Sequence, residues 1–243
     1  MLYGERMISF ILAAAALFVA PPGPDSAVTW GPTIHQIVVV KASTLMPPSL
    51  QHQILHHRRE ILRGCLDVLS ENLQPDPQGA DVTTAYDAVL VELRSRPQFE
   101  EICYGLGRLS ALAGEFASPL RDLPPGSDTT AFRDFAVGAL DTFPLVITHD
   151  GEEHLSEGSL SAYLQYVARR NSLRRELIAG ILCEESDPET WRDQRSAAYG
   201  AGLLCYNDLV LDTARLWLYL WQEAGGEIGE APYFRIPVAG AQQ

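Results

Sequence analysis

The chain lacks the short motifs by which several common enzyme classes are recognised. Its 243 residues contain no GxSxG nucleophile elbow, no GxxxxGK phosphate loop and no CxxC pair. Their absence leaves a serine hydrolase of the elbow type, a P-loop nucleotide-binding protein and a CxxC metal or redox site without support. No cysteine has a recognisable histidine partner in the sequence, so a cysteine nucleophile has no support either.

Positive charge is scarce as well. Lysine and arginine together number 18 against 31 acidic residues, which gives a formal net charge of -13 and a pI of about 4.8. No long basic run offsets this excess. We therefore expect no nucleic acid partner and no general electrostatic attraction to anionic lipid surfaces.

Long apolar runs are confined to the N-terminus. The run from Met7 to Ala20 follows Arg6, is shorter than the ~20 residues of a spanning helix and ends at prolines. We expect residues 1–29 to form a secretory signal peptide, or an uncleaved anchor, and the protein to be exported to the periplasm or secreted. No later run is long enough to span a membrane.

The remaining residues, 30–243, are expected to form one all-α domain. Neither a period-two strand pattern nor an internal repeat occurs, and 47% of the residues are hydrophobic. Caps, breakers and apolar periodicity predict a multi-helix bundle of about seven helices. The expected helices cover residues 33–41, 49–73, 82–94, 97–118, 130–142, 159–183 with an arginine-rich interruption at 169–175, and 186–224.

Two helix ends and one loop follow from particular residues. Thr33 and Gln36 form a capping box, and Ser127 or Asp128 is expected to cap the helix that follows. Residues 149–158 are polar and are expected to connect two helices. The four cysteines lie far apart within predicted helices, so two disulfides and four reduced core thiols both remain open.

The stretch from Phe99 to Arg121 combines an apolar stripe with a stripe of small residues. Large apolar side chains recur at steps of three and four, and the small residues are Gly107, Ala111, Gly114 and Ser118. Because glycine inside a helix costs roughly 1 kcal/mol relative to alanine, we expect another helix or a site to approach this backbone closely.

The same stretch carries a family resemblance. LGRLSALAGEFASPLR resembles the central helix of zinc-dependent phospholipases C and the related single-strand-specific nucleases, in which a His, an Asp and a final His bind zinc. These positions fall here on Ala111, Glu115 and Arg121. WGPTIH, which starts at Trp30, is similar to the start of the mature family proteins, and the terminal RSAAYGAGLLCYNDLVLDTARLWLYLWQEAGG is similar to the closing helix of bacterial relatives.

The resemblance implies a zinc site that has lost most of its ligands. The matching positions offer Trp30, His35, Asp67 and Glu115, whereas a catalytic zinc needs about three protein donors and an open position for water. Arg121 is expected to pair with Glu115 in place of a metal. A His-x-x-x-Glu pair of the family falls near Thr129 and Arg133 and is also missing.

Two functions follow from the resemblance. The first is a non-catalytic phospholipase C-like protein, a pseudoenzyme that binds a phospholipid, a phosphoester or an envelope partner. The alternative is an active zinc-dependent hydrolase of phosphodiester or phospholipid bonds, with Asp67 and Glu115 in its reduced site. A third possibility is a structural or assembly module.

Three other groups of polar residues have simpler interpretations. His52, His56 and Glu60 share a helical stripe and could bind zinc, but the pattern is more typical of a solvated face. His149 and His154 lie in an acidic loop that could hold a cation. In the last helix, Asp208, Asp212 and Arg215 have the spacing of an ion-pair ladder within one helix.

Overall fold

The computed structural model describes residues 30–228 and 233, apart from 72–75, 96–97, 122, 124–127, 157–158 and 185–186. Every regular element among these residues is helical, which confirms the all-α class. The expected signal segment, 1–29, lies outside the described residues. In the part of the chain that is described, no helix has the length and apolar character needed to cross a membrane.

The elements follow one another along the chain with short connections. They are α2 (Pro32–Ser43), α3 (Pro48–His56), α4 (Arg58–Ser70), α5 (Ala80–Ser95), α6 (Phe99–Phe116), α7 (Thr129–Gly138), α8 (Glu152–Ser156), α9 (Leu160–Glu184), the 3-10 turn η1 (Thr190–Arg192) and α10 (Ala197–Glu223).

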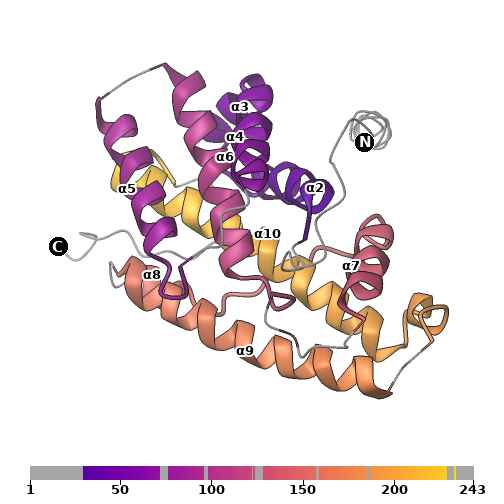
Figure 1. Ribbon diagram of the computed structural model, residues 1–243. Coiled ribbons are helices and arrows are strands. Elements are labelled where there is room, and N and C mark those ends of the chain that lie inside the picture. The colour runs from indigo at the N-terminus through magenta and orange to yellow at the C-terminus, as the bar shows by residue number, and fades with distance from the viewer. Residues whose placement is uncertain are drawn as a thin grey trace.

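Helix α10 is the centre of the bundle. It runs between α9 on one side and the group formed by α2, α5 and α6 on the other, and α7 also packs against it (Figure 1). Nearly every side chain from Ala198 to Leu220 is buried. Only a narrow strip that includes Leu204 and Asp208 stays partly exposed, so α10 lies inside the core around most of its circumference.

Helix α6 is the second buried helix and confirms the expected close approach to its small-residue stripe. A Cβ added to Gly107 would lie 2.0 Å from the carbonyl oxygen of Ile61 in α4, and one added to Gly64 would lie 2.1 Å from the carbonyl oxygen of Tyr104. The backbones of α4 and α6 therefore touch where two glycines face each other's helix.

Three helices differ from the sequence-based expectation. The helix expected over 49–73 is divided at His57, whose φ of -101° and ψ of 31° separate α3 from α4. The arginine-rich interruption at 169–175 is absent, because α9 is continuous from Leu160 to Glu184. The polar segment 149–158 contains the short helix α8.

Helix starts were predicted with mixed success. Asp128 caps α7 by accepting a hydrogen bond from the Ala131 N–H at 3.0 Å, as expected. The predicted capping box at Thr33 is wrong, because α2 starts at Pro32 and no side chain caps it. The helix start predicted at 186–189 is also wrong, since α10 begins at Ala197 with Ser196 as its cap.

Candidate functional site

Two of the four predicted metal ligands meet in the core. Nε2 of His35, in α2, lies 2.7 Å from Oε1 of Glu115, in α6, although eighty residues separate them in the chain. Both side chains are at most 5% exposed. The predicted pair of Glu115 with Arg121 is wrong, because the partner of Glu115 among the described residues is His35.

A glycine makes room for this contact. A Cβ on Gly114 would lie 2.7 Å from Cε1 of His35, so the imidazole rests directly on the backbone of α6. The small-residue stripe of α6 thus receives helix α4 at Gly107 and the His35 ring at Gly114. The expectation was that another helix or a site approaches this backbone, and helix α4 confirms the first alternative.

The other two predicted ligands do not complete a metal site. Asp67 accepts a hydrogen bond of 2.8 Å from the Tyr104 hydroxyl. Tyr104 and Glu115 are eleven residues apart on α6, which places them about 16 Å from one another along the helix axis. Trp30 is 1% exposed, and its indole Nε1 has no hydrogen-bond partner among the described residues. The resemblance assigns zinc binding to the backbone amine and carbonyl of Trp30 and not to its indole.

The donor set therefore does not fit the zinc that the resemblance implies. A zinc site needs three or four donors from Cys, His, Asp or Glu around one point. In the described residues, no three such side chains are grouped closely enough to share an ion. His35 and Glu115 bond to each other, and Ala111, which matches a family ligand position, contributes only a buried methyl group.

The alternative histidine sites behave as a solvated face and a helix-end contact. His52 and His56 are exposed, and their rings stack at 6.5 Å on α3, whereas Glu60 belongs to the separate helix α4. Nδ1 of His149 lies 3.0 Å from Oε1 of Glu152 at the start of α8. Among the residues that the structure describes, neither group brings a third metal-binding donor to its pair.

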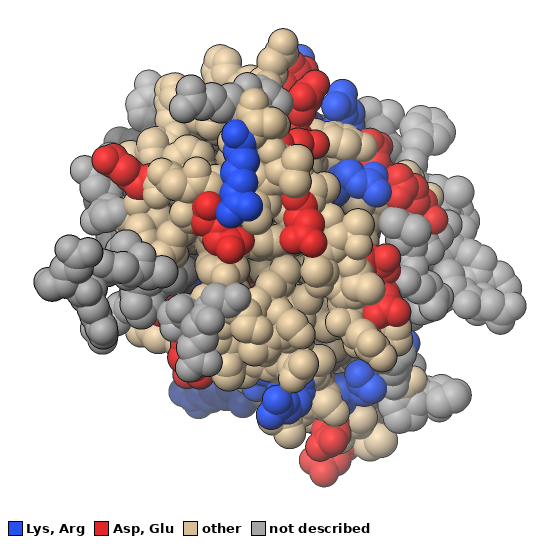
Figure 2. Space-filling view, turned by 90° about the vertical axis from the view of Figure 1, so that its left-hand side faces the viewer, with Lys and Arg blue, Asp and Glu red and all other residues tan. Residues whose placement is uncertain are grey.

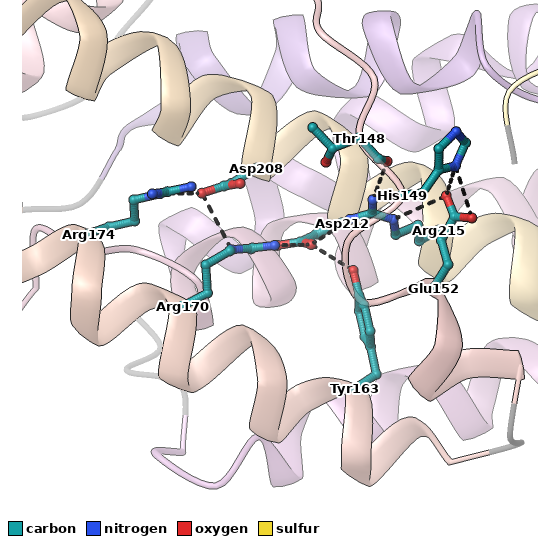
Figure 3. Close-up of polar contacts among 9 residues, drawn as sticks. All are labelled: Thr148, His149, Glu152, Tyr163, Arg170, Arg174, Asp208, Asp212 and Arg215. Carbon is teal, nitrogen blue, oxygen red and sulfur yellow. Dashed lines mark hydrogen bonds and ion pairs between the residues drawn. The ribbon is translucent and has the colours of Figure 1, made fainter.

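A cluster of charged residues lies between α9 and α10, and the pairing between these two helices was not predicted. Figure 3 shows Asp212 of α10 at its centre. Its carboxylate accepts a 2.6 Å hydrogen bond from the Tyr163 hydroxyl and is bound by the guanidinium of Arg170, both in α9. Arg215 lies 3.9 Å away on the other side.

Two further arms extend this cluster. Asp208, one turn before Asp212, is bound by Arg174 at 2.9 Å and lies 3.4 Å from Arg170. At the other end, Arg215 is 1% exposed, donates to the Thr148 carbonyl at 2.6 Å and lies 4.0 Å from Glu152. Three arginines thus face three carboxylates, and the cluster joins α8, α9, α10 and the segment before α8 (Figure 3).

Burial and charge act against each other in this cluster. Burial raises the pKa of the Asp208 carboxyl above its usual value, and the nearby Arg170 and Arg174 only partly offset this effect. Burial lowers the pKa of Arg170, but the carboxylates of Asp212 and Asp208 outweigh it and hold that pKa well above the usual range. Burial, followed by the charge of Asp212, raises the pKa of Tyr163.

The predicted ion-pair ladder within the last helix is therefore largely wrong. Asp208 and Asp212 pair mainly across to α9, and only the longer contact between Asp212 and Arg215 stays within α10. A signal for this pairing was present in the sequence. Arg170 and Arg174 have the same i, i+4 spacing as the two aspartates, as expected for charged stripes on two helices that face each other.

A cavity of about 460 Å³ opens beside this cluster, and its size is typical of a small-molecule site. It lies between α9 and α10, next to the segment 146–150. The lining residues are Val146, Thr148, Asp150, Tyr166, Arg169, Arg170, Leu173, Arg174, Leu203, Leu204, Asn207, Asp208 and Leu211. Sequence reasoning missed this cavity because the segments that line it, 146–150, 166–174 and 203–211, lie far apart in the chain.

The charged surface is otherwise scattered. On the face drawn in Figure 2, acidic and basic side chains are interspersed among uncharged residues, several of them next to a side chain of opposite charge, and no continuous basic surface covers the described part of it. Some basic side chains gather at the lower edge, at the height of α9 in Figure 1. A long polyanion finds no broad basic surface on this face.

Comparison with known proteins adds no relative. No protein-family model, no curated protein and no solved structure matches the chain. The resemblance to the zinc-dependent phospholipases C therefore stays a prediction that rests on the residues given above.

Proposed function

We propose that the protein is an exported, non-catalytic binding protein on a helical scaffold that resembles the zinc-dependent phospholipases C. The observation that carries this proposal is the contact between His35 and Glu115. The two predicted ligands that do meet bond to each other at 2.7 Å in the core, and Asp67 is bonded to Tyr104 elsewhere on α6. Among the described residues, no third His, Cys, Asp or Glu joins this pair to hold a catalytic zinc with an open position.

The cavity between α9 and α10 supports the binding half of the proposal. It is concave and has mainly apolar walls with a few charged groups at fixed positions, which is the usual composition of a small-molecule site. Arg170 and Arg174 are held by Asp208 and Asp212 rather than arranged around a nucleophile or a metal. The proposed role is therefore to hold a ligand and not to cleave it.

Measurements of metal content, turnover and thermal stability test the proposal that the protein is non-catalytic. Purified protein is analysed for zinc, assayed on a generic phosphodiester and melted with and without a chelator. We expect less than one zinc per chain, no turnover and the same melting temperature in both conditions. His35→Ala is expected to lower the melting temperature by roughly 10 °C, because a buried carboxylate without a partner costs about 3–5 kcal/mol.

The chelator separates a structural pair from a metal site. A structural pair predicts that His35→Ala loses the same stability with and without chelator, and that the control His56→Ala, on an exposed histidine, loses little in either condition. One tightly held zinc per chain that disappears in His35→Ala, together with turnover that disappears with it, would overturn the proposal in favour of a reduced-site hydrolase.

A further inference from the structure

The walls of the α9–α10 cavity leave large apolar side chains in water. Val146 is 50% exposed, Leu173 is 64% exposed and Leu204 is 40% exposed, and all three line this one cavity from three different segments. Leu203 and Leu211 continue the apolar surface. Apolar side chains that converge on a concave site indicate a ligand with an apolar body.

The charged groups of the cavity come mainly from one turn of α9. Arg170 and Arg174 are held by Asp208 and Asp212. Arg169 is exposed and has no ion pair or hydrogen bond within the described residues. Its guanidinium is therefore the one lining cation that is free to bind a ligand, and a guanidinium binds a carboxylate or phosphate with two parallel hydrogen bonds.

The sign of the ligand follows from the charges along the lining. Three arginines face two carboxylates, Asp150 and Asp208, and Asp208 already serves two of the arginines. Asp208 is held by Arg170 and Arg174, so a cationic head group could bind only the exposed Asp150, and the three arginines of the lining would repel it. An anionic head group can bind Arg169 without breaking any pair in the cluster.

We propose that this cavity binds a single-chain amphiphile whose head is one oxyanion, a carboxylate or a phosphate, with Arg169 as the head-group contact and the leucine walls around the chain. The inference rests on the proposed binding function and names its site and ligand class. It depends on neither the His35–Glu115 pair nor on any metal.

Calorimetry with four twelve-carbon probes tests the proposal, the charged probes below their micelle concentrations and dodecanol below its solubility limit. We expect dodecanoate or dodecyl phosphate to bind at one per chain, with dodecanol and dodecyltrimethylammonium weaker by about tenfold or more. Whichever of the two anions binds more tightly identifies the head group as a carboxylate or a phosphate. Arg169→Gln is expected to weaken the anion by about tenfold and to leave dodecanol unchanged.

Matched variants separate the site from general effects. Arg59→Gln removes the same charge from an exposed position on α4, away from the cavity, and is expected to leave binding unchanged. Leu173→Asn is expected to weaken all bound probes, whereas Leu55→Asn, at a similarly exposed leucine of α3, is not. Circular dichroism checks that each variant is folded.

Several results would overturn this inference. They would not affect the proposal that the protein is non-catalytic, because the metal and turnover assays test that proposal separately. These results are no binding by either anion, equal binding of dodecanol and dodecanoate, tighter binding of the cationic probe, and an equal loss in Arg169→Gln and Arg59→Gln. Zinc-dependent turnover would overturn the non-catalytic role and would leave the result at the cavity unchanged.

Discussion

Replacement of Gly107 by alanine is expected to separate the two helices that touch most closely. The new Cβ would lie 2.0 Å from the Ile61 carbonyl oxygen, 2.8 Å from its carbon and 3.0 Å from its Cα, whereas ordinary contacts begin near 3.4 Å. These are backbone atoms inside α4, so no side chain can rotate away. The helices must move apart by more than an ångström.

The cost follows from two opposed terms. Overpacking of a core costs about 1–3 kcal/mol and sometimes more, and a clash with backbone belongs at the upper end. Alanine regains about 1 kcal/mol of helix propensity. The separation also weakens the Cys65 thiol contact with the Gly107 carbonyl, which is 3.1 Å long. We expect a net loss of at least about 2 kcal/mol and a fall of about 4–8 °C in melting temperature.

Gly180 of α9 provides the matched control, because nothing lies within 4 Å of a Cβ built there. Gly180→Ala is expected to stabilise the protein by about 0.5–1 kcal/mol through propensity alone. Thermal and urea unfolding of both variants, followed by far-UV circular dichroism, measure the difference. If Gly107→Ala is as stable as Gly180→Ala, the close crossing of α4 and α6 is not present and the reasoning fails.

Two further outcomes follow from burial. The question of disulfides is settled in favour of four free cysteines, of which Cys183 is exposed and not a core thiol. Burial raises the pKa of Cys65 to about 12, and Cys103 and Cys205 are buried as well. A thiol-specific disulfide reagent at pH 8 should therefore label only Cys183 quickly in native protein and all four cysteines in denaturant. Fast labelling of more than one cysteine, or of fewer than four in denaturant, would contradict the four free thiols. Asp212→Asn should lower the free energy of unfolding by about 3–5 kcal/mol, because it removes the carboxylate that pairs with buried arginines. Arg108→Gln, in a partly exposed pair with Glu71, should lower it by less than about 1 kcal/mol. Urea midpoints measure both losses, and equal losses would contradict the assigned burial.

The parts of the fold that sequence reasoning predicted are those decided by neighbours in the chain. The cap at Asp128 and the stop at Gly225 depend on backbone groups within one turn, and both are where they were expected. The break at His57 has no glycine or proline to mark it. The arginine-rich part of α9 resembled an interruption because its partners lie about forty residues further along the chain.

Only part of the candidate site could be predicted from the sequence, for the same reason. The spacing of Gly107 and Gly114 predicted close approach to α6, but the approaching groups, Ile61 and His35, were not named by any local pattern. His35 and Glu115 were each singled out as metal ligands, and they do meet. Their identities did not reveal that they bond to each other, since the choice between a shared ion and a direct hydrogen bond depends on distances that tertiary packing sets.

The buried charges between α9 and α10 fix how the two helices align, and this determines the position of the cavity. Their net contribution to the free energy of unfolding is smaller. The attraction within a buried ion pair does little more than offset the free-energy cost of desolvating its two charges. If the register of the helices slipped, the charges would be buried without partners, and this costs far more free energy. Helix α9 therefore has only one register along α10 that keeps these charges paired. In that register Tyr163 and Arg170 contact Asp212, and Arg174 contacts Asp208. That register places Arg169 and Leu173 on the cavity side of α9, opposite Leu204, so the polar cluster sets the geometry of the apolar site beside it.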